Sequence, residues 1–226
     1  MNATADSPVL VVVPAYNAAG HLPELIPRLR RVVDNEHLLF INDGSIDNTP
    51  QLLHDLQVNY ISFPQNRGKG AALAAGYEYA LQRGYRSVLT LDADLQHLPE
   101  EIPGLLRSDD GDRIVIGTRH MDPRVMPFSR WLTNNLTSMI VSVFSRCRVR
   151  DSQSGFRLVP TSLLRHIPLK SRNYDFESEL LFKAGALRAR VAEAPISTVY
   201  EDSQSFINPL RDGWRFVRQI WKRIWM

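Results

Sequence analysis

Cysteine is almost missing from this sequence, because Cys147 is the single one among 226 residues. One cysteine excludes an internal disulfide framework and every cysteine-rich zinc site, and it fits a reducing compartment. Long apolar runs are missing too. The longest, residues 139–144 with their neighbours, is far shorter than the roughly 20 residues that a spanning helix needs. Residues 1–8 are polar and show no secretory signal. We therefore expect a cytoplasmic protein that does not cross a bilayer.

Two common nucleotide-binding signatures are also missing. No Walker motif occurs, and Gly68-x-Gly70 continues to Leu73, where a dinucleotide fingerprint requires glycine or alanine. Hydride transfer and P-loop chemistry are therefore disfavoured. The net charge of +3 is too small to indicate nucleic acid as a partner. A content of 44% hydrophobic and 23% charged residues, without repeats, predicts one folded domain.

Apolar and amphipathic segments alternate along the first half of the chain. Val9 to Val13 is an apolar, β-branched run that predicts a strand buried on both faces. Apolar residues at three- and four-residue spacing then predict a helix from Leu22 that ends near Asn35. The alternation continues with strands at 37–41, 59–63, 87–91 and 113–117 and helices at 51–56 and 71–82. This order predicts an α/β fold with a mostly parallel, Rossmann-like central sheet and helices on both faces.

Four polar loops follow the first four predicted strands. Since parallel strands end at one edge of a sheet, these loops are expected to meet there and to bind a ligand. The loops contain Pro14-Ala15-Tyr16-Asn17, Asp43-Gly44-Ser45, Asn66-Arg67-Gly68-Lys69-Gly70 and Asp92-Ala93-Asp94.

The fourth loop has the composition of a metal site. Residues two apart on a strand point the same way, so Asp92 and Asp94 present both carboxylates to one spot, with Gln96 next if the chain stays extended. Oxygen ligands without a cysteine or histidine shell favour Mg²⁺ or Mn²⁺. His97 either joins this cluster or packs beside it. An isolated pair of this kind more often caps a helix or a turn, so the neighbouring loops decide the interpretation.

Those loops offer groups that suit a nucleotide. Asp43 is placed either to accept hydrogen bonds from a base or ribose or to cap a turn. Gly68 allows close approach of the backbone, and Arg67 and Lys69 offer positive charge to phosphate or to a base edge.

Six segments in a fixed order resemble family 2 glycosyltransferases of the GT-A fold. They are VVVPAYN, INDGSIDNT, NRGKGAALAAGYEYA, LDADLQHLPEEIP, GTR and DSQSGFR. The fourth segment resembles the dolichyl-phosphate mannose synthase and polyprenyl-phosphate glycosyltransferase branch. The resemblance covers Val9 to Arg157 well and the remainder loosely.

The resemblance implies an inverting, metal-dependent transfer of a sugar from a GDP- or UDP-sugar to a polyprenyl phosphate. It implies that Asp92, Asp94 and Gln96 hold Mg²⁺ or Mn²⁺, and that Asp94, Arg119 and Arg130 carry the catalysis, the two arginines by neutralising donor and lipid phosphates. The donor-binding residues expected on these grounds are Pro14, Ala15, Tyr16, Asn17, Asp43, Arg67, Lys69, Asp92 and Ala93.

Two positions depart from the family pattern. Ala18 and Ala19 stand where an acidic residue is common after the PAYN-type motif, which leaves guanine and uracil open. YEDSQSF at 200–206 lacks the lysine that this branch commonly brings to the diphosphate. Either another cation such as Arg211 or Arg157 replaces it, or the acceptor and the loop closure differ.

The second half of the chain is interpreted as the acceptor side. A lipid phosphate is already an anion and needs positive charge, whereas a hydroxyl acceptor needs a base, for which Glu177, Glu179 and Asp151 are candidates. The arginines fit a phosphate acceptor, or else form a solvated basic face; they are Arg119, Arg124, Arg130, Arg146, Arg148 and Arg150. A nucleotidyltransferase is disfavoured, because the loop after the first strand is PAYNAAG and not a glycine-rich basic loop. A non-catalytic membrane subunit is the remaining alternative.

Two amphipathic segments suggest contact with a membrane. Residues 130–144 form either core or a lipid-facing helix, and a tryptophan-rich stripe flanked by basic residues at 214–225 is typical of an interfacial anchor. We expect a catalytic domain at 1–210, with a nucleotide-sugar half at about 8–118 and an acceptor half at about 119–210. Residues 211–226 are expected to form a helix on the cytoplasmic face of a membrane, where a membrane-protein partner is plausible.

Overall fold

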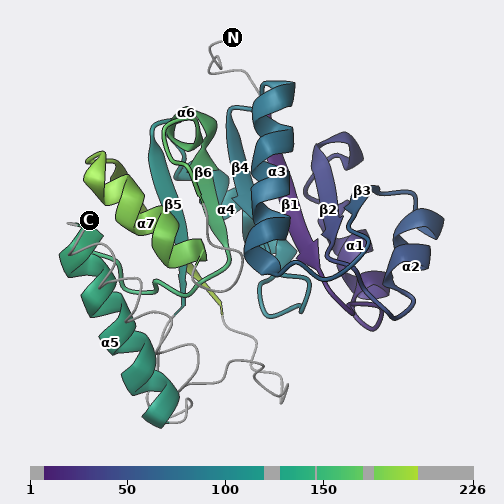
Figure 1. Ribbon diagram of the computed structural model, residues 1–226, viewed down its shortest axis with the longest axis horizontal. Helices are drawn as coiled ribbons and strands as arrows, with labels where there is room; N and C mark the ends of the chain where they lie inside the picture. The colour runs from purple at the N-terminus through teal and green to yellow at the C-terminus, as the bar shows by residue number, and fades with distance from the viewer. Residues whose placement is uncertain (1–7, 120–127, 146, 170–175, 198–226) are drawn as a thin grey trace.

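A seven-stranded sheet forms the centre of the molecule (Figure 1). The computed structural model describes residues 8–119, 128–145, 147–169 and 176–197, apart from the side chains of 128–133 and 144. The strands are β1 (Val9–Ala15), β2 (Leu38–Asn42), β3 (Asn59–Ser62), β4 (Ser87–Thr90), β5 (Arg113–Arg119), β6 (Arg157–Pro160) and β7 (Arg190–Ile196). The α-helices are α1 (Leu22–Leu29), α2 (Thr49–Asp55), α3 (Lys69–Arg83), α4 (Ile102–Arg107), α5 (Phe128–Ser145), α6 (Thr161–Leu164) and α7 (Phe176–Ala186).

The strand order is β3-β2-β1-β4-β6-β5-β7. Neighbouring strands are parallel except for β6, which is antiparallel to both β4 and β5. The order reverses between β1 and β4, and open α/β sheets bind ligands beside the carboxyl ends of strands at such a point. The predicted α/β class with a mostly parallel sheet is therefore confirmed.

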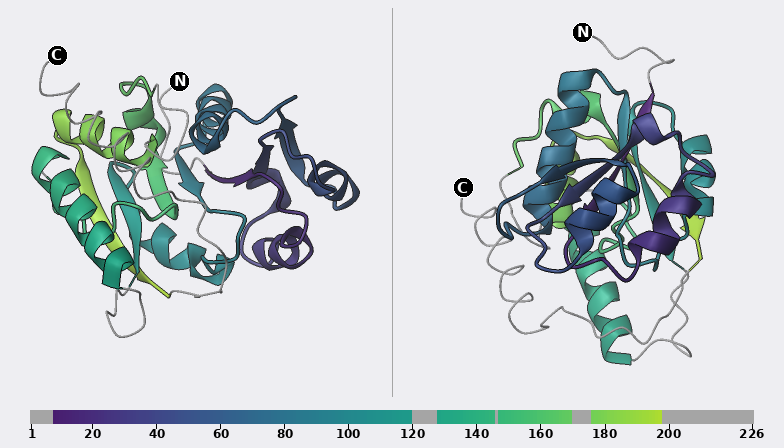
Figure 2. Two further views of the ribbon diagram at one scale, coloured as in Figure 1. Left: turned by 60° about the horizontal axis from the view of Figure 1, so that its bottom comes forward. Right: turned by 90° about the vertical axis from the view of Figure 1, so that its right-hand side faces the viewer.

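Helices cover both faces of the sheet (Figure 2). Two hydrophobic clusters fill the spaces between the layers. Apolar side chains of α1, α2 and α4 pack on one face with Val11, Val13 and Phe40. Those of α3, α5, α6 and α7 pack on the other face with Leu10 and Val12. Successive residues of β1 point to opposite faces, and both faces are buried. This explains why its sequence is a continuous apolar run.

The first predicted helix is shorter than its apolar pattern suggested. It ends at Leu29 and not near Asn35, and the chain continues in turns. Arg30 holds this turn because its guanidinium donates to the carbonyl oxygens of Leu56 and Gln57. Val32 and Val33 still pack against the core, so their spacing reports burial without a continued helix.

The amphipathic segment predicted at 130–144 lies within α5, which leaves an apolar stripe open to solvent. Leu136, Met139 and Val143 are 50%, 58% and 69% exposed, whereas Val141 is fully buried. Residues three, four and seven apart share one face of a helix. Within the described part of the chain, no helix is both long and apolar enough to cross a membrane. The predicted helix at 211–226 and the 200–206 segment lie outside the described residues.

Candidate active site

The loops after β1 and β2 are locked together by short polar contacts. The backbone N–H of Asn17 donates to Ser45 Oγ (3.0 Å), and Asn17 Oδ1 accepts from the N–H of Ile46 (3.0 Å). The N–H of Ala18 donates to Thr49 Oγ1 at 2.8 Å. The Asn17 side chain therefore fixes the β2 loop, and beside it the Tyr16 side chain is about half exposed.

Asp43 is nearly buried and binds the third loop. Its two carboxylate oxygens accept the backbone N–H groups of Arg67 (2.7 Å) and Gly68 (2.9 Å). Burial raises the pKa of Asp43, and these two N–H groups offset part of that rise. Of the two roles expected for Asp43, the structure displays the turn cap, which positions the start of α3.

Lys69 lies between two carboxylates from different elements. Its Nζ is 2.7 Å from Asp92 Oδ1, 2.9 Å from Asp92 Oδ2 and 3.0 Å from Glu177 Oε1. Burial alone would lower the pKa of Lys69, but the two carboxylates outweigh burial and raise it well above its usual value. Sequence reasoning offered this charge to a nucleotide, whereas here it neutralises Asp92.

The segment from Asp92 to Gln96 is a turn, so the expectation of an extended chain was wrong. β4 ends at Thr90, and Leu95 has φ 59°, in the left-handed region. The N–H of Gln96 donates to Asp94 Oδ1 at 3.1 Å, which closes the turn. Burial and then the neighbouring charge of Asp92 raise the pKa of Asp94. Burial also opposes ionisation of Asp92, but the Lys69 ammonium outweighs it and lowers the pKa of Asp92. Asp94 is therefore influenced by the charge of Asp92 across a turn and not along an extended strand.

Gly155 forms the wall behind Asp92. A Cβ atom at residue 155 would lie 2.3 Å from Asp92 Oδ2, which is far inside van der Waals contact. Asp92 is therefore held between this backbone and the Lys69 ammonium. The role of Gly155 was not predicted from the sequence, where DSQSGFR entered as a family segment and through Asp151 and Arg157; the glycine before Phe156 was the available signal.

His97 is buried beside the same turn. Its ring lies 5.5 Å from the ring of Phe156, centroid to centroid, and its Nδ1 has no hydrogen-bond partner among the described residues. Burial lowers the pKa of His97 to about 4, against the attraction of Asp92. The imidazole is therefore neutral at pH 7 and packs on the aromatic ring, which was one of its two expected roles.

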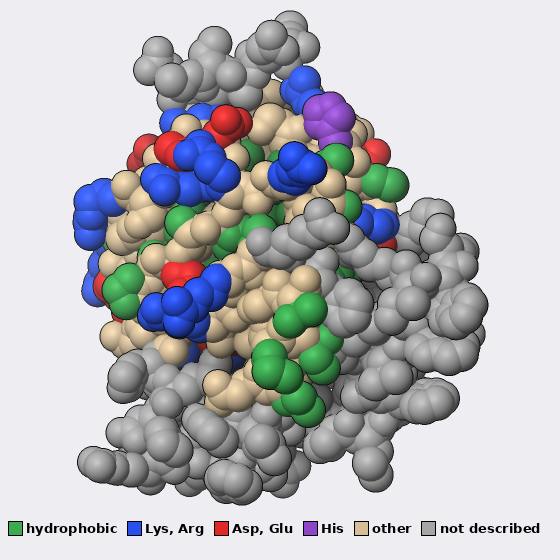
Figure 3. Space-filling model, turned by 90° about the vertical axis from the view of Figure 1, so that its left-hand side faces the viewer, with side chains coloured by type: hydrophobic (Ala, Val, Ile, Leu, Met, Phe, Trp, Pro, Cys, Tyr) green, Lys and Arg blue, Asp and Glu red, His purple; other side chains and the backbone are tan. Residues whose placement is uncertain are grey.

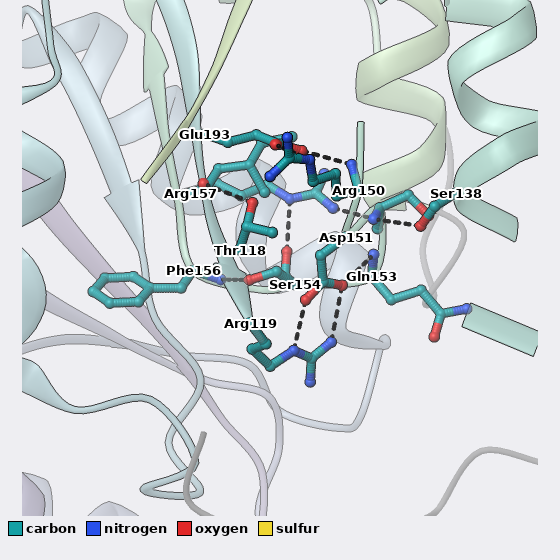
Figure 4. Close-up of polar contacts among 12 residues, drawn as sticks. Thr118, Arg119, Ser138, Arg150, Asp151, Gln153, Ser154, Phe156, Arg157 and Glu193 are labelled. Atoms are coloured by element: carbon teal, nitrogen blue, oxygen red, sulfur yellow. Dashed lines mark hydrogen bonds and ion pairs between the residues drawn. The ribbon is translucent and has the colours of Figure 1, made fainter. Parts of the chain in front are cut away.

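Arg119, at the end of β5, forms an ion pair with Asp151, which lies in the loop before β6 (Figure 4). Its Nε is 2.7 Å from Asp151 Oδ2 and its Nη2 is 3.0 Å from Asp151 Oδ1, and Asp151 is fully buried. A two-pronged contact of this kind fixes the plane of a guanidinium. The electrostatic influence of Arg119 on both Asp92 and His97 places it at the same site.

Arg157 has a structural role in this site (Figure 4). It is 1% exposed and donates to the carbonyl oxygens of Ser154 (2.7 Å), Ser152 (2.5 Å) and Glu177 (3.0 Å). All three bonds go to backbone, so Arg157 joins the loop before β6 to the start of α7. The suggestion that Arg157 replaces the missing lysine at the diphosphate is therefore wrong, and Arg211 lies outside the described residues.

The remaining predicted residues lie near the same edge of the sheet, or their side chains are outside the described part of the chain. Pro14 and Ala15 end β1 and Ala93 lies beside Asp92, the two alanines being buried. The guanidinium of Arg67 lies 4.7 Å from the centre of the Phe63 ring. Arg130 belongs to α5, but its side chain is not described.

The donor set fits a hard divalent cation in its chemistry. Asp92, Asp94 and Gln96 offer only oxygen ligands, and the two interacting carboxylates would be stabilised by positive charge. Among the described residues, no group of three histidine, cysteine, aspartate or glutamate side chains converges on one point. A bound Mg²⁺ or Mn²⁺ would thus complete its shell with substrate phosphates and water.

Comparison with known proteins shows the family of this chain. The family model described as glycosyl transferase family 2 matches residues 10–171. The undecaprenyl-phosphate mannosyltransferase of Micrococcus luteus is 31% identical over 202 residues, which cover 84% of this chain and 83% of that protein. The UDP-N-acetylglucosamine–dolichyl-phosphate N-acetylglucosaminyltransferase of Methanococcus voltae is 28% identical over 222 residues, 88% of each chain.

A solved structure shares the fold. Glucosyl-3-phosphoglycerate synthase from Mycobacterium tuberculosis, crystallised with Mn²⁺, UDP and phosphoglyceric acid, has a TM-score of 0.73 and 20% identity, and the match covers 96% of this chain and 77% of that one. The fold is that of GT-A glycosyltransferases. More closely, the chain belongs to glycosyl transferase family 2.

Proposed function

We propose that this enzyme transfers a sugar, with inversion, from a GDP- or UDP-sugar to a polyprenyl phosphate at a membrane surface. The observation that supports it most is the cluster of Asp92, Lys69 and Glu177, in which Lys69 forms ion pairs with both carboxylates. Arg119 acts electrostatically on Asp92, and Asp92 follows β4, where the strand order of the sheet reverses. Relatives that act on undecaprenyl and dolichyl phosphates add weight to the lipid acceptor.

The nucleotide-sugar donor is proposed to bind to the loops that follow the strands within residues 8–118. Tyr16 and the backbone near Asn17 would hold the nucleoside, and Asp43 would do so indirectly, by fixing the loop of Arg67. Asp92, Asp94 and Gln96 would hold Mg²⁺ or Mn²⁺. Such a cation supplies positive charge next to the leaving diphosphate.

The acceptor half, at 119–210, supplies a fixed positive charge. Arg119 is oriented by the fully buried Asp151 and is placed to bind a phosphate. A lipid phosphate is an anion at pH 7, so its oxygen attacks the anomeric carbon without a base. The chain's task is then to position the acceptor and to stabilise charge. Arg130 is proposed as a second phosphate ligand on the family resemblance alone.

Acceptor hydroxyls are the second candidate class, and the structure disfavours them. A hydroxyl needs a carboxylate to take its proton. Asp151 is paired with Arg119, Glu177 with Lys69 and Glu179 with Lys183. Each candidate base is therefore already engaged by a cation of this chain before an acceptor binds.

Membrane contact is proposed for two segments. Leu136, Met139 and Val143 form an exposed apolar stripe on α5. Apolar side chains gather on the face of the molecule shown in Figure 3. The tryptophan-rich residues 211–226 are proposed to form an interfacial helix on the same membrane. A peripheral site on the cytoplasmic face would bring the acceptor phosphate to the enzyme, with or without a membrane-protein partner.

The acceptor assignment is tested by offering two lipids that differ in one group. Purified enzyme with Mn²⁺ receives radiolabelled GDP- and UDP-sugars and, in detergent, either a polyprenyl phosphate or the matching polyprenol. We expect label in the lipid phase with the phosphate and none with the alcohol. Label on the alcohol, or on neither lipid, would overturn the assignment.

A further inference from the structure

Lys69 occupies an unusual electrostatic position. It is the first residue of α3, where the helix dipole places partial positive charge and where acidic residues are favoured. Its ammonium is also largely buried, with 19% of the side chain exposed. Both effects destabilise a cation, so neighbouring carboxylates must compensate. Asp92 and Glu177 do so at 2.7 Å and 3.0 Å.

The ion pair with Lys69 engages Asp92, which is also one of the proposed metal ligands. Both carboxylate oxygens of Asp92 lie within 2.9 Å of the same ammonium, and Gly155 closes the other side. When ionised, Asp92, Asp94 and Glu177 exceed the charge of Lys69 by two negative charges. That excess matches one divalent cation, so the charges balance with both Lys69 and the metal in place.

We propose that Lys69 is the internal counter-ion of the metal site, a positioning residue that holds Asp92 and limits the affinity of the site for a bare divalent cation. The remaining attraction for the cation then comes from the negative charge of the donor diphosphate. Metal and donor therefore bind together. Glu177 shares the ammonium and prevents it from pairing with Asp92 alone. The inference rests on the proposed metal site of the transferase.

The first test is Mn²⁺ binding without nucleotide, measured by electron paramagnetic resonance. Lys69→Met removes a positive charge beside the cation and releases Asp92, so we expect affinity to rise about fivefold or more. Arg83→Met is the matched control, because it removes a charge from the last residue of the same helix and should change affinity less than about twofold. Unchanged or weaker binding by Lys69→Met would overturn the inference.

A second readout is the thermal stability of the metal-free protein. Without Lys69, Asp92 faces the negative charges of Asp94 and Glu177 without a counter-ion, so Lys69→Met should lower the Tm by about 4 °C or more. Glu177→Gln should lower the Tm when Lys69 is present, because the ammonium loses a partner, and raise it in Lys69→Met, because repulsion falls. An effect of the same sign in both backgrounds would overturn the inference. Should Lys69→Met fail to fold, Lys69→Gln carries the same affinity test.

The two proposals fail in different ways. If the wild-type protein binds no Mn²⁺ even with nucleoside diphosphate, the proposed metal site itself is wrong. If the wild-type protein binds Mn²⁺ and Lys69→Met does not bind it more tightly, the counter-ion role alone is wrong.

Discussion

At the scale of single residues, the position of the Asp92 carboxylate depends on residue 155 being a glycine, which has no side chain. Gly155→Ala would put a methyl group 2.3 Å from Asp92 Oδ2, so the carboxylate must move. We expect sugar transfer to fall by about a hundredfold, as for other displacements of about 1 Å in active sites. Initial rates with saturating donor measure this effect.

The matched control for that substitution is Gly20→Ala. An added Cβ at residue 20 meets nothing within 4 Å, so its rate should stay within about twofold of wild type. Equal rates for Gly155→Ala and wild type would contradict the placement of Asp92 against the 155 backbone.

His97 gives a prediction on pH. Its pKa in the folded protein is about 4, and in the unfolded chain it is about 6.5, so the unfolded state binds more protons between these values. Stability contributed by neutral His97 is therefore complete above pH 6.5 and is lost as the pH falls towards 4, by about 3 kcal/mol in total.

This pH dependence is measured by urea unfolding in EDTA from pH 7 to 4. His97→Phe, which keeps an aromatic ring beside Phe156 and cannot titrate, should lose less stability over that range. Parallel pH curves for the two proteins would show that the imidazole is not the group responsible.

At the scale of elements, Arg157 joins two segments far apart in the chain. Arg157→Met would leave the carbonyl oxygens of Ser152, Ser154 and Glu177 without this donor. We expect a loss of about 3 kcal/mol and a fall in Tm of about 6–12 °C. Differential scanning calorimetry measures it.

Arg190→Met is the comparison for that variant. Arg190 pairs with Asp110 but is 63% exposed, so its loss should cost less than about 1 kcal/mol. A similar Tm for both variants would mean that the buried arginine contributes no more than a surface one.

Local patterns predicted most elements and their order. The apolar run of β1 and the spacing in α3 depend on burial, which alternates with the same period as the strand or helix. The apolar residues from Leu22 to Val33 keep helical spacing although α1 ends at Leu29, because Val32 and Val33 pack against the core, partly buried, from a turn. Apolar periodicity therefore locates a buried face better than it locates the end of a helix.

The site was predictable in part, for the same reason. Asp92 and Asp94 were identified from their spacing and from the family resemblance, but their turn geometry depends on Leu95 adopting a positive φ. The partnership of Lys69 with Glu177 joins residues 108 positions apart in the sequence, and no local pattern encodes it. The sequence suggested Glu177 only as a candidate base for a hydroxyl acceptor.

At the scale of the whole molecule, one face of α5 is expected to meet lipid. Leu136→Gln with Val143→Gln replaces two side chains that are at least half exposed, so the fold should persist while the apolar stripe is lost. We expect cosedimentation with anionic liposomes to weaken about tenfold.

Leu187→Gln, which changes an equally exposed leucine after α7, should bind liposomes like wild type. Unaltered binding by the α5 variant would leave residues 211–226 as the proposed membrane contact. Removal of residues 214–226 tests that segment separately.

The central claim, metal-dependent transfer to a lipid phosphate through Asp94, is tested most directly by one assay. Wild type and Asp94→Asn receive labelled donor and polyprenyl phosphate, with Mn²⁺ or with EDTA. The account predicts labelled lipid only for wild type with Mn²⁺, and a loss of about a hundredfold or more for Asp94→Asn, which keeps the shape but removes the charge. Labelled lipid formed equally by Asp94→Asn, or by wild type in EDTA, would contradict it.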